Sequence, residues 1–399
     1  MRIGPSQEEI RRLNLGALLR YVHVRGPTSR AELTANLRLN RSTIGALTAD
    51  LVAAGLVGEE LPRGHGRAGR PSLVVRPEPA TYVFAFTIDA DRVTAARVGL
   101  GGVVLDRRTL ARPRGELPPA AVVAPLADLV RDMQRTIAPG ARYVGSGAAV
   151  SAMVRREGGL VRLAPHVGWV DEPLGEILAT VLGPDHSVVI RNGADLRALA
   201  EHTRGAAVDC DNLIYLHGDA GIGGGIIAGG RPVTGHGGYG GEVGHMVVNP
   251  HGKPCGCGAR GCWETEVGEE ALLRAAKRDG YGRKLVGDVV DAAARGDAVA
   301  QDAIRQVGDW LGFGVANLVN IFNPEMVIFG GVLRTIYLAA AAQVRSQLNR
   351  NGLPACREHV RLRTPVLGDE AAIIGASEVA FEALLDDPLD AAVAAPVAS

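Results

Sequence analysis

The stretch Gly241-Glu242-Val243-Gly244-His245, followed by Cys255-Gly256-Cys257-Gly258 and Gly261-Cys262-Trp263-Glu264, is the most informative part of the 399-residue sequence. One histidine and three cysteines supply the nitrogen and sulfur ligands that tetrahedral zinc prefers, and four protein ligands leave no open position for water. We therefore predict a structural Zn²⁺ in the loop 245–262, where intervening glycines allow a tight turn. The predicted ligands are His245, Cys255, Cys257 and Cys262. The alternative is three reduced cysteines that cluster by chance.

The amino-terminal part of the chain is basic, although the whole chain has no net formal charge. Residues 1–78 contain twelve arginines and seven acidic residues, so the remainder carries a net charge of about −5. Such an asymmetry suits an anionic polymer and points weakly to nucleic acid.

The length of the chain favours two or three domains. No run of eighteen apolar residues occurs, and the amino terminus carries charges where a signal peptide needs an apolar segment. We therefore expect a cytoplasmic protein that does not contact a membrane.

Residues 1–78 are predicted to form an α+β winged helix-turn-helix domain. Two capping boxes, Ser6 with Glu9 and Ser29 with Glu32, begin helices that we expect to run to about 24 and 37. Asn40 caps a third helix that ends before position 55. Three short helices with a tight turn before the third are typical of this motif, whose third helix enters the major groove of DNA. The alternative is a small polar helical bundle.

Strands at 56–57 and 73–75 flank a segment rich in glycine and arginine, which we interpret as the wing. Arginines on a glycine-rich loop suit a narrow minor groove, although the same segment would also serve as a flexible linker. The residues that we expect to contact DNA are Arg30, Asn40, Arg41, Ser42 and Thr43 from the helices and Arg63, His65, Arg67 and Arg70 from the wing.

From residue 79 to about 385 strands and helices alternate, which predicts an α/β fold. We expect strands at 82–88, at 93–98 and after the turn Gly101-Gly102, then a helix over 120–136. A further strand and a glycine-rich turn precede Ala148. The two halves of this region would each form one lobe, and the tail 386–399, rich in alanine, proline and aspartate, is expected to be disordered.

The zinc stretch resembles the signature of the ROK family (repressors, open reading frames, kinases), which reads Gly-Glu-x-Gly-His and then Cys-x-Cys-Gly-x-x-Gly-Cys-x-Glu. The resemblance extends from Tyr82 to Leu384 and includes Gly221–Ile226 and Asn320–Glu325. It implies an actin-like, two-lobed sugar-kinase fold with a sugar in the cleft. Regulators of the family carry a winged helix in front, as this chain does.

The resemblance also assigns residues to a sugar effector. Carboxylates and imidazole accept hydrogen bonds from neighbouring hydroxyls, which suits this task. The effector-binding residues that it implies are Asn192, Glu242, His245 and Glu264. Alternatively, the two glutamates only support the zinc loop.

Three departures from the family distinguish this chain from a kinase. The general base of the family motif Glu-Asn-Asp-Ala-Asn is replaced by Gly193, and the glycine of the phosphate-binding Asp-x-Gly-x-Thr by Asp91. Ser151-Ala152 stands where many members have a Pro-Gly turn beside the sugar. We therefore predict no catalytic residue and no kinase activity.

The sequence thus predicts a sugar-responsive repressor of carbohydrate uptake or catabolism genes, which binds an inverted-repeat DNA operator as a homodimer or homotetramer. Its effector would be a hexose, an amino sugar or a sugar phosphate, the last because Gly193 removes a negative charge and Arg191 lies nearby in the sequence. One alternative is an active ATP-dependent sugar kinase with a DNA-binding head. The other is a ligand-independent DNA-binding protein with a vestigial pocket.

Overall fold

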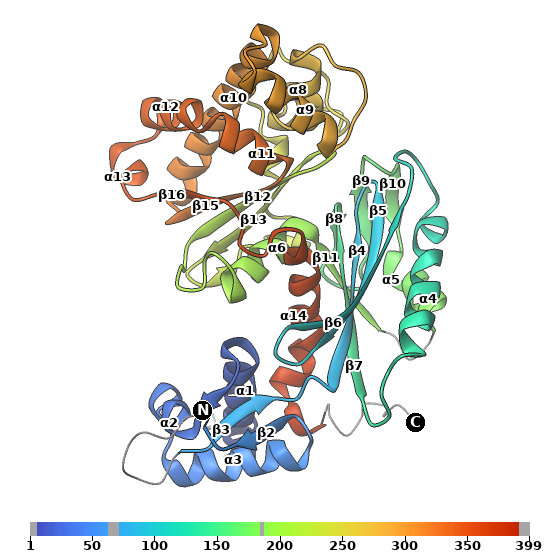
Figure 1. Ribbon diagram of the computed structural model, residues 1–399, viewed down its shortest axis with the longest axis vertical. Helices are drawn as coiled ribbons and strands as arrows, with labels where there is room; N and C mark the ends of the chain where they lie inside the picture. The colour runs from blue at the N-terminus through green and yellow to red at the C-terminus, as the bar shows by residue number, and fades with distance from the viewer. Residues whose placement is uncertain (1–5, 63–71, 184–186, 391–399) are drawn as a thin grey trace.

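The computed structural model describes residues 6–62, 72–183 and 187–390 (Figure 1). Figure 1 shows three parts: the amino-terminal head at one end, a lobe beside it, and a second lobe at the far end of the molecule. No helix in these ranges is long and apolar enough to cross a membrane.

The head is a three-helix unit with a small antiparallel sheet of strand order β1-β3-β2. Its elements are α1 (Gln7–Arg25), β1 (Thr28–Ser29), α2 (Arg30–Leu37), α3 (Arg41–Ala53), β2 (Val57–Glu60) and β3 (Val74–Pro77). Both predicted capping boxes are formed, and Asn40 caps α3 as expected. Side chain–backbone pairs three residues apart therefore fix where each helix begins.

The first lobe contains a five-stranded sheet of order β11-β7-β4-β5-β6. Its strands are β4 (Thr81–Ile88), β5 (Arg92–Gly99), β6 (Val103–Ala111), β7 (Arg142–Val150) and β11 (Val188–Asn192). Helices α4 (Pro119–Gln134) and α5 (Leu174–Leu182) and a small sheet of β8 (Met153–Val154), β9 (Val161–Ala164) and β10 (Trp169–Glu172) complete it. The expected early strands and the helix near 120–136 are thus present.

The second lobe repeats this arrangement with strand order β14-β13-β12-β15-β16. Its strands are β12 (Leu213–Gly218), β13 (Ile222–Ala228), β14 (Arg231–Pro232), β15 (Met326–Gly331) and β16 (Arg361–Arg363). Its helices are α7 (Trp263–Glu266), α8 (Glu269–Ala275), α9 (Arg283–Ala294), α10 (Ala298–Phe322), α11 (Val332–Ala339), α12 (Ala341–Asn351) and α13 (Pro354–Arg357). Each sheet is an antiparallel meander extended by two parallel strands, so each half of the region is one lobe of an α/β fold.

Two helices lie between the lobes. Helix α6 (Gly193–Arg204) packs against β12 and β13 of the second lobe, while α14 (Ala371–Asp386) packs against β4 and β7 of the first. The two helices also pack against each other. The expected glycine-rich turn before Ala148 is wrong, because Gly145 and Gly147 lie inside β7. A Cβ on Gly147 would collide with the carbonyl oxygen of Ala376, so glycine here allows α14 to approach the sheet closely.

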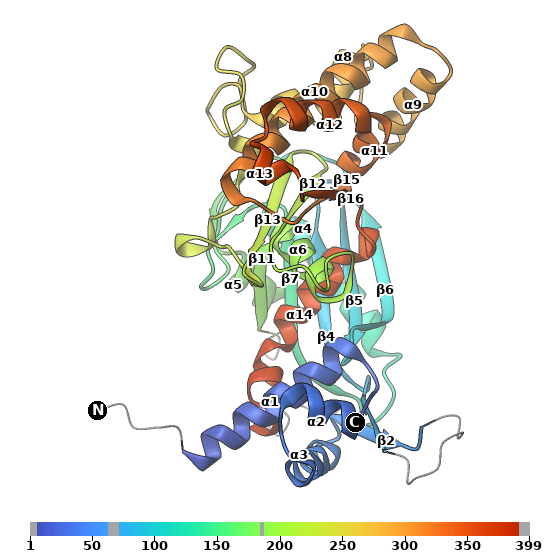
Figure 2. The same ribbon diagram turned by 90° about the vertical axis from the view of Figure 1, so that its left-hand side faces the viewer.

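One hydrophobic cluster spans the head and the first lobe, which also has a second cluster of its own. Leu18 and Leu19 of α1 join Val83 of β4 and Phe381 and Leu385 of α14 in a single buried cluster. Figure 2 shows α1 lying across the lower end of α14. Residue 78 therefore follows the last strand of the head in the sequence, but it is not a boundary in packing.

The expected disordered tail does not begin at residue 386. Asp386 is the last residue of α14 and pairs with Arg20 of the head at 2.8 Å, and Asp387 pairs with Arg12 at 3.5 Å. Residues 388–390 are helical. Ion pairs and packing against α1 thus extend the structure beyond the expected end, while 391–399 lie outside the described residues.

Candidate effector pocket and metal centre

The four predicted zinc ligands come together at one point of the second lobe. Their ligand atoms all lie within 4.8 Å of one another, with Cys255 Sγ 3.6 Å from His245 Nδ1 and Cys257 Sγ 3.7 Å from Cys262 Sγ. Zinc–sulfur and zinc–nitrogen bonds of about 2.3 and 2.0 Å place tetrahedral ligands roughly 3.5–3.8 Å apart. The cluster therefore has the donor set and the spacing of a structural zinc site.

Trp263 anchors the metal-binding loop in the core of the second lobe. Its side chain is fully buried and donates a hydrogen bond from Nε1 to the carbonyl of Trp310 at 2.9 Å. A Cβ on Gly314 would collide with the indole, so this position of α10 suits glycine. Cys262, the residue before Trp263, is held in place by the same packing.

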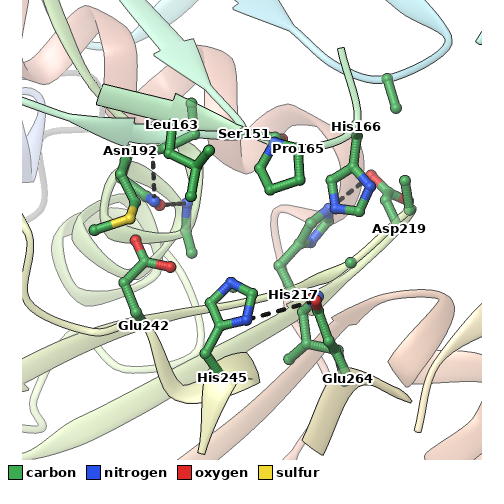
Figure 3. A pocket seen from close by; sticks show the side chains of 18 of the residues that line it. Ser151, Leu163, Pro165, His166, Asn192, His217, Asp219, Glu242, His245 and Glu264 are labelled. Atoms are coloured by element: carbon green, nitrogen blue, oxygen red, sulfur yellow. Dashed lines mark hydrogen bonds and ion pairs between the residues drawn. The ribbon is translucent and has the colours of Figure 1, made fainter. Parts of the chain in front are cut away.

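A cavity lies next to the metal-binding cluster, lined by residues of both lobes (Figure 3). The four residues that the sequence assigned to an effector, Asn192, Glu242, His245 and Glu264, all line it. So do Ser151 and Ala152, the positions at which the chain departs from the family's Pro-Gly turn.

Among these residues, Glu242 has the environment of a ligand-binding group. Its side chain makes no hydrogen bond or ion pair with the described residues, and burial raises the pKa of its carboxyl group. A buried carboxylate that faces a cavity without a partner is suited to accept hydrogen bonds from a ligand's hydroxyls. Figure 3 shows its carboxylate directed toward the cavity, opposite Leu163.

Glu264 and Asn192 are more strongly engaged by the protein. Glu264 lies 3.6 Å from His245 Nδ1 through Oε1 and accepts from Ile222 N at 3.3 Å through Oε2, so it contacts both the metal cluster and β13. Asn192 donates to Ala152 O at 3.0 Å and accepts from Ala194 N at 2.7 Å. These bonds fix the amino end of α6 at the edge of the cavity.

Sequence reasoning missed four polar residues of the cavity wall, which are His166, Arg197, His217 and Asp219. His217 Nε2 and Asp219 Oδ2 are 2.9 Å apart, and Arg283 pairs with Asp219 at 3.2 Å. Burial lowers the pKa of His217, and its Nδ1 is buried without a hydrogen-bond partner among the described residues. His217 and Asp219 stand two positions apart, directly before the glycine-rich stretch Gly221–Ile226. This pair of polar residues was the signal that could have identified both of them.

An arginine from the next turn of the helix lies beside Gly193, the position at which the sequence predicts the loss of a kinase base. Gly193 is the first residue of α6, and a Cβ placed on it would lie 2.7 Å from Arg197 Nη1. Arg197 also pairs with Asp89 at 3.3 Å. Arg191, which lies nearby in the sequence, donates from its guanidinium to the carbonyls of Arg156 and Ile190 and is not among the residues that line the cavity.

The proposed DNA-contacting residues of the head differ in whether their side chains are already bonded within the head. Arg41 and Ser42 are exposed at the start of α3, which lies at the end of the molecule away from the lobes (Figure 1). Asn40 accepts from Thr43 N at 2.8 Å, and Arg30 forms a two-bond ion pair with Glu59 at 2.5 and 2.7 Å. Arg30 and Asn40 therefore stabilise the motif itself, while the wing residues 63, 65, 67 and 70 lie outside the described residues.

Comparisons with known proteins agree with this architecture. Residues 84–383 match the ROK family. The xylose repressor of Bacillus subtilis is 28% identical over 387 residues, which cover 96% of this chain and 98% of the repressor.

Two solved structures resemble the chain to different extents. A ROK family transcriptional regulator, a homologue of the Escherichia coli MLC protein, superposes with a TM-score of 0.79 at 26% identity and covers 96% of this chain and 99% of its own. A ROK glucokinase from Streptomyces griseus, in complex with glucose and AMPPNP, has a TM-score of 0.62 at 28% identity and covers 75% of this chain and 99% of its own. The regulator therefore matches the head as well as the lobes. The chain belongs to the ROK family.

Proposed function

We propose that the chain is a DNA-binding transcriptional repressor of sugar metabolism whose affinity for its operator depends on a sugar in the interlobe cavity. The observation that carries this proposal is the position of α6. Its first residues line the cavity, and its last residue, Arg204, contacts the head about 18 Å away. One rigid element thus connects the two sites.

The contact at the far end of α6 is a buried polar network. Arg204 Nη1 donates to Val24 O at 3.4 Å and to Gly101 O at 3.0 Å, and its Nε donates to Glu378 Oε1 at 2.7 Å. Glu378 Oε2 is 3.2 Å from Nε2 of His23 in α1. Because His23 Nδ1 accepts from Gly101 N at 2.9 Å, Nε2 carries the ring proton and donates to Glu378.

A sugar would act by moving α6 relative to the first lobe. In actin-like folds the lobes flank the ligand, so closing them on a sugar shifts the helices between them. Arg204, at the end of α6, would then displace Glu378 and, through it, α1. This would change the position of α3 in each head of a homodimer or homotetramer, and two heads read an inverted repeat only when their spacing fits the half-sites.

The metal site supports this arrangement. Zn²⁺ held by His245, Cys255, Cys257 and Cys262 would cross-link the loop 245–262, which begins at the cavity residue His245 and ends two residues before Glu264. Four protein ligands leave no position for catalytic water. His245 would then bind the metal through Nδ1 and present its other nitrogen toward the cavity, since Nδ1 is the atom near Cys255.

Phosphoryl transfer is not part of the proposed function. A sugar kinase requires a group that accepts the proton of the attacking hydroxyl, whereas position 193 has no side chain and a guanidinium occupies the space beside it. A guanidinium cannot act as a base at neutral pH. The kinase alternative predicts ADP formation from some hexose, which a coupled assay measures directly.

The test is fluorescence polarisation with duplexes selected from the organism's own genome, with and without a panel of sugars. We expect nanomolar operator binding that one sugar weakens. R41A should lose DNA affinity and keep the sugar-induced thermal shift, whereas E242Q should keep DNA affinity and lose the response to sugar. Failure to bind any duplex would refute the proposal, and DNA binding that no sugar alters would support the ligand-independent alternative.

A further inference from the structure

We propose that Arg197 makes the cavity a receptor for a phosphorylated sugar, with the phosphate bound at the amino end of α6. This inference rests on the proposed function, because it assumes that a sugar occupies the cavity. It names the chemical class of that sugar and the residue that selects it.

The first argument is the exchange of charge at the amino end of α6. Gly193 leaves a space that Arg197 fills, since its Nη1 would be only 2.7 Å from a side chain at 193. In a kinase of the family this position holds an anionic side chain, whereas here the nearest group is a cation. A positive charge at this point of the cavity wall attracts an anionic ligand.

The second argument is that Arg197 has donors to spare. Its side chain is 8% exposed, and its only partner among the described residues is Asp89, reached through Nη2 at 3.3 Å. A guanidinium has five N–H donors arranged to bind two oxygens of one phosphate. Arg197 lines the cavity, and its Nη1 lies where a side chain on Gly193 would reach, beside the cavity residues Asn192 and Ala194.

Two carboxylates near Arg197 also have other partners. Asp89 also lies 3.6 Å from Arg92 Nε, and Asp219 is paired with Arg283 and hydrogen-bonded to His217. Each of these two carboxylates thus has a cationic or donor partner other than Arg197.

The third argument is the direction of α6. This twelve-residue helix begins at the cavity, and Asn192 and Ala194 line the wall there. The amino end of a helix carries partial positive charge and unpaired backbone N–H groups, which favour phosphate. The helix end and Arg197 lie on the same side of the cavity and reinforce one another.

The test is isothermal titration of the full-length, zinc-loaded protein with matched pairs of ligands: glucose and glucose 6-phosphate, and N-acetylglucosamine and its 6-phosphate. We expect one phosphorylated sugar to bind about ten- to a hundredfold more tightly than its free form, as for a hydrogen bond to a charged group. R197Q should remove most of that difference between the phosphorylated and the free sugar. R191Q is the matched control, since this arginine lies outside the cavity.

Two results would overturn the inference. One is a free sugar that binds the wild-type protein as tightly as its phosphate, a measurement that does not depend on whether a variant folds. The other is an unchanged preference in R197Q or in G193A, whose added methyl would displace the guanidinium without removing its charge. If free sugars release DNA and Arg197 has no influence, the inference fails and the proposed function stands. If no sugar in either form binds or alters DNA affinity, the proposed function itself fails.

Discussion

Glu378 joins the DNA-binding head to the helix that lines the cavity, because its carboxylate accepts from Arg204 Nε of α6 at 2.7 Å while its other oxygen contacts His23 of α1. All three side chains are almost entirely buried: His23 is 0%, Glu378 9% and Arg204 13% exposed. Each of the three side chains has at least one partner in this network, and removing a member would leave another buried polar group unpaired. It is therefore both a structural link and the place where a movement of α6 reaches the head.

Replacing Glu378 by glutamine should destabilise the protein and uncouple the two sites. The substitution leaves Arg204 buried without its anion, and breaking a buried pair costs about 3–5 kcal/mol. We expect a lower urea midpoint and a smaller effect of sugar on DNA affinity. E382Q, on the exposed face of the same helix, should change the free energy of unfolding by less than about 0.5 kcal/mol. Equal stability of the two variants would contradict the role of Glu378.

Acid should remove the contribution of Glu378. Burial opposes its ionisation, but the hydrogen bond from His23 and the charge of Arg204 outweigh burial and lower its pKa from 4.5 to about 2. A lowered pKa in the folded state adds stability above pH 4.5, which is lost as the pH falls toward 2. Urea unfolding between pH 6 and pH 3 should show this loss in the wild type and not in E378Q. Parallel pH profiles would argue against it.

Asp195 should show the opposite pH dependence. Burial and the nearby Glu242 carboxylate raise its pKa from 3.8 to about 7. The folded state therefore holds a proton that the unfolded state releases, so stability falls as the pH rises from about 4 to 7. We expect D195N to raise the melting temperature at pH 8 and to leave it unchanged at pH 4. D211N, at an exposed position, provides the control and should have no effect at either pH.

Removing zinc should loosen the second lobe. The binding energy of a structural metal is part of the folding energy, so a chelator should lower the melting temperature and abolish sugar binding through His245. C257S should behave like the chelated protein, and C356S, outside the cluster, like the wild type. Elemental analysis should find one zinc per wild-type chain. A metal-free preparation with unchanged melting would show that the four residues are not a metal site.

The sequence by itself determined the features that depend on short-range spacing. The caps at Ser6, Ser29 and Asn40 pair groups a few residues apart, so the helix starts follow from local chemistry. The three cysteines of the metal cluster lie within eight positions, and alternating strands and helices gave the α/β class. The ROK signature added the two-lobed arrangement.

Only the tertiary structure decided which groups face one another across these elements. The sequence pointed to Arg191 and missed Arg197, but Arg191 lies in a strand and bonds to backbone carbonyls, while Arg197 lies one helical turn after Gly193 and points at its empty side-chain position. Two other features also depend on how closely α14 approaches the sheet of the first lobe. They are the core shared by head and lobe and the need for glycine inside β7. Side-chain direction and long-range packing are set by the whole fold. A residue packs against segments that lie far away in the sequence, and the residues next to it in the sequence do not determine which segments these are.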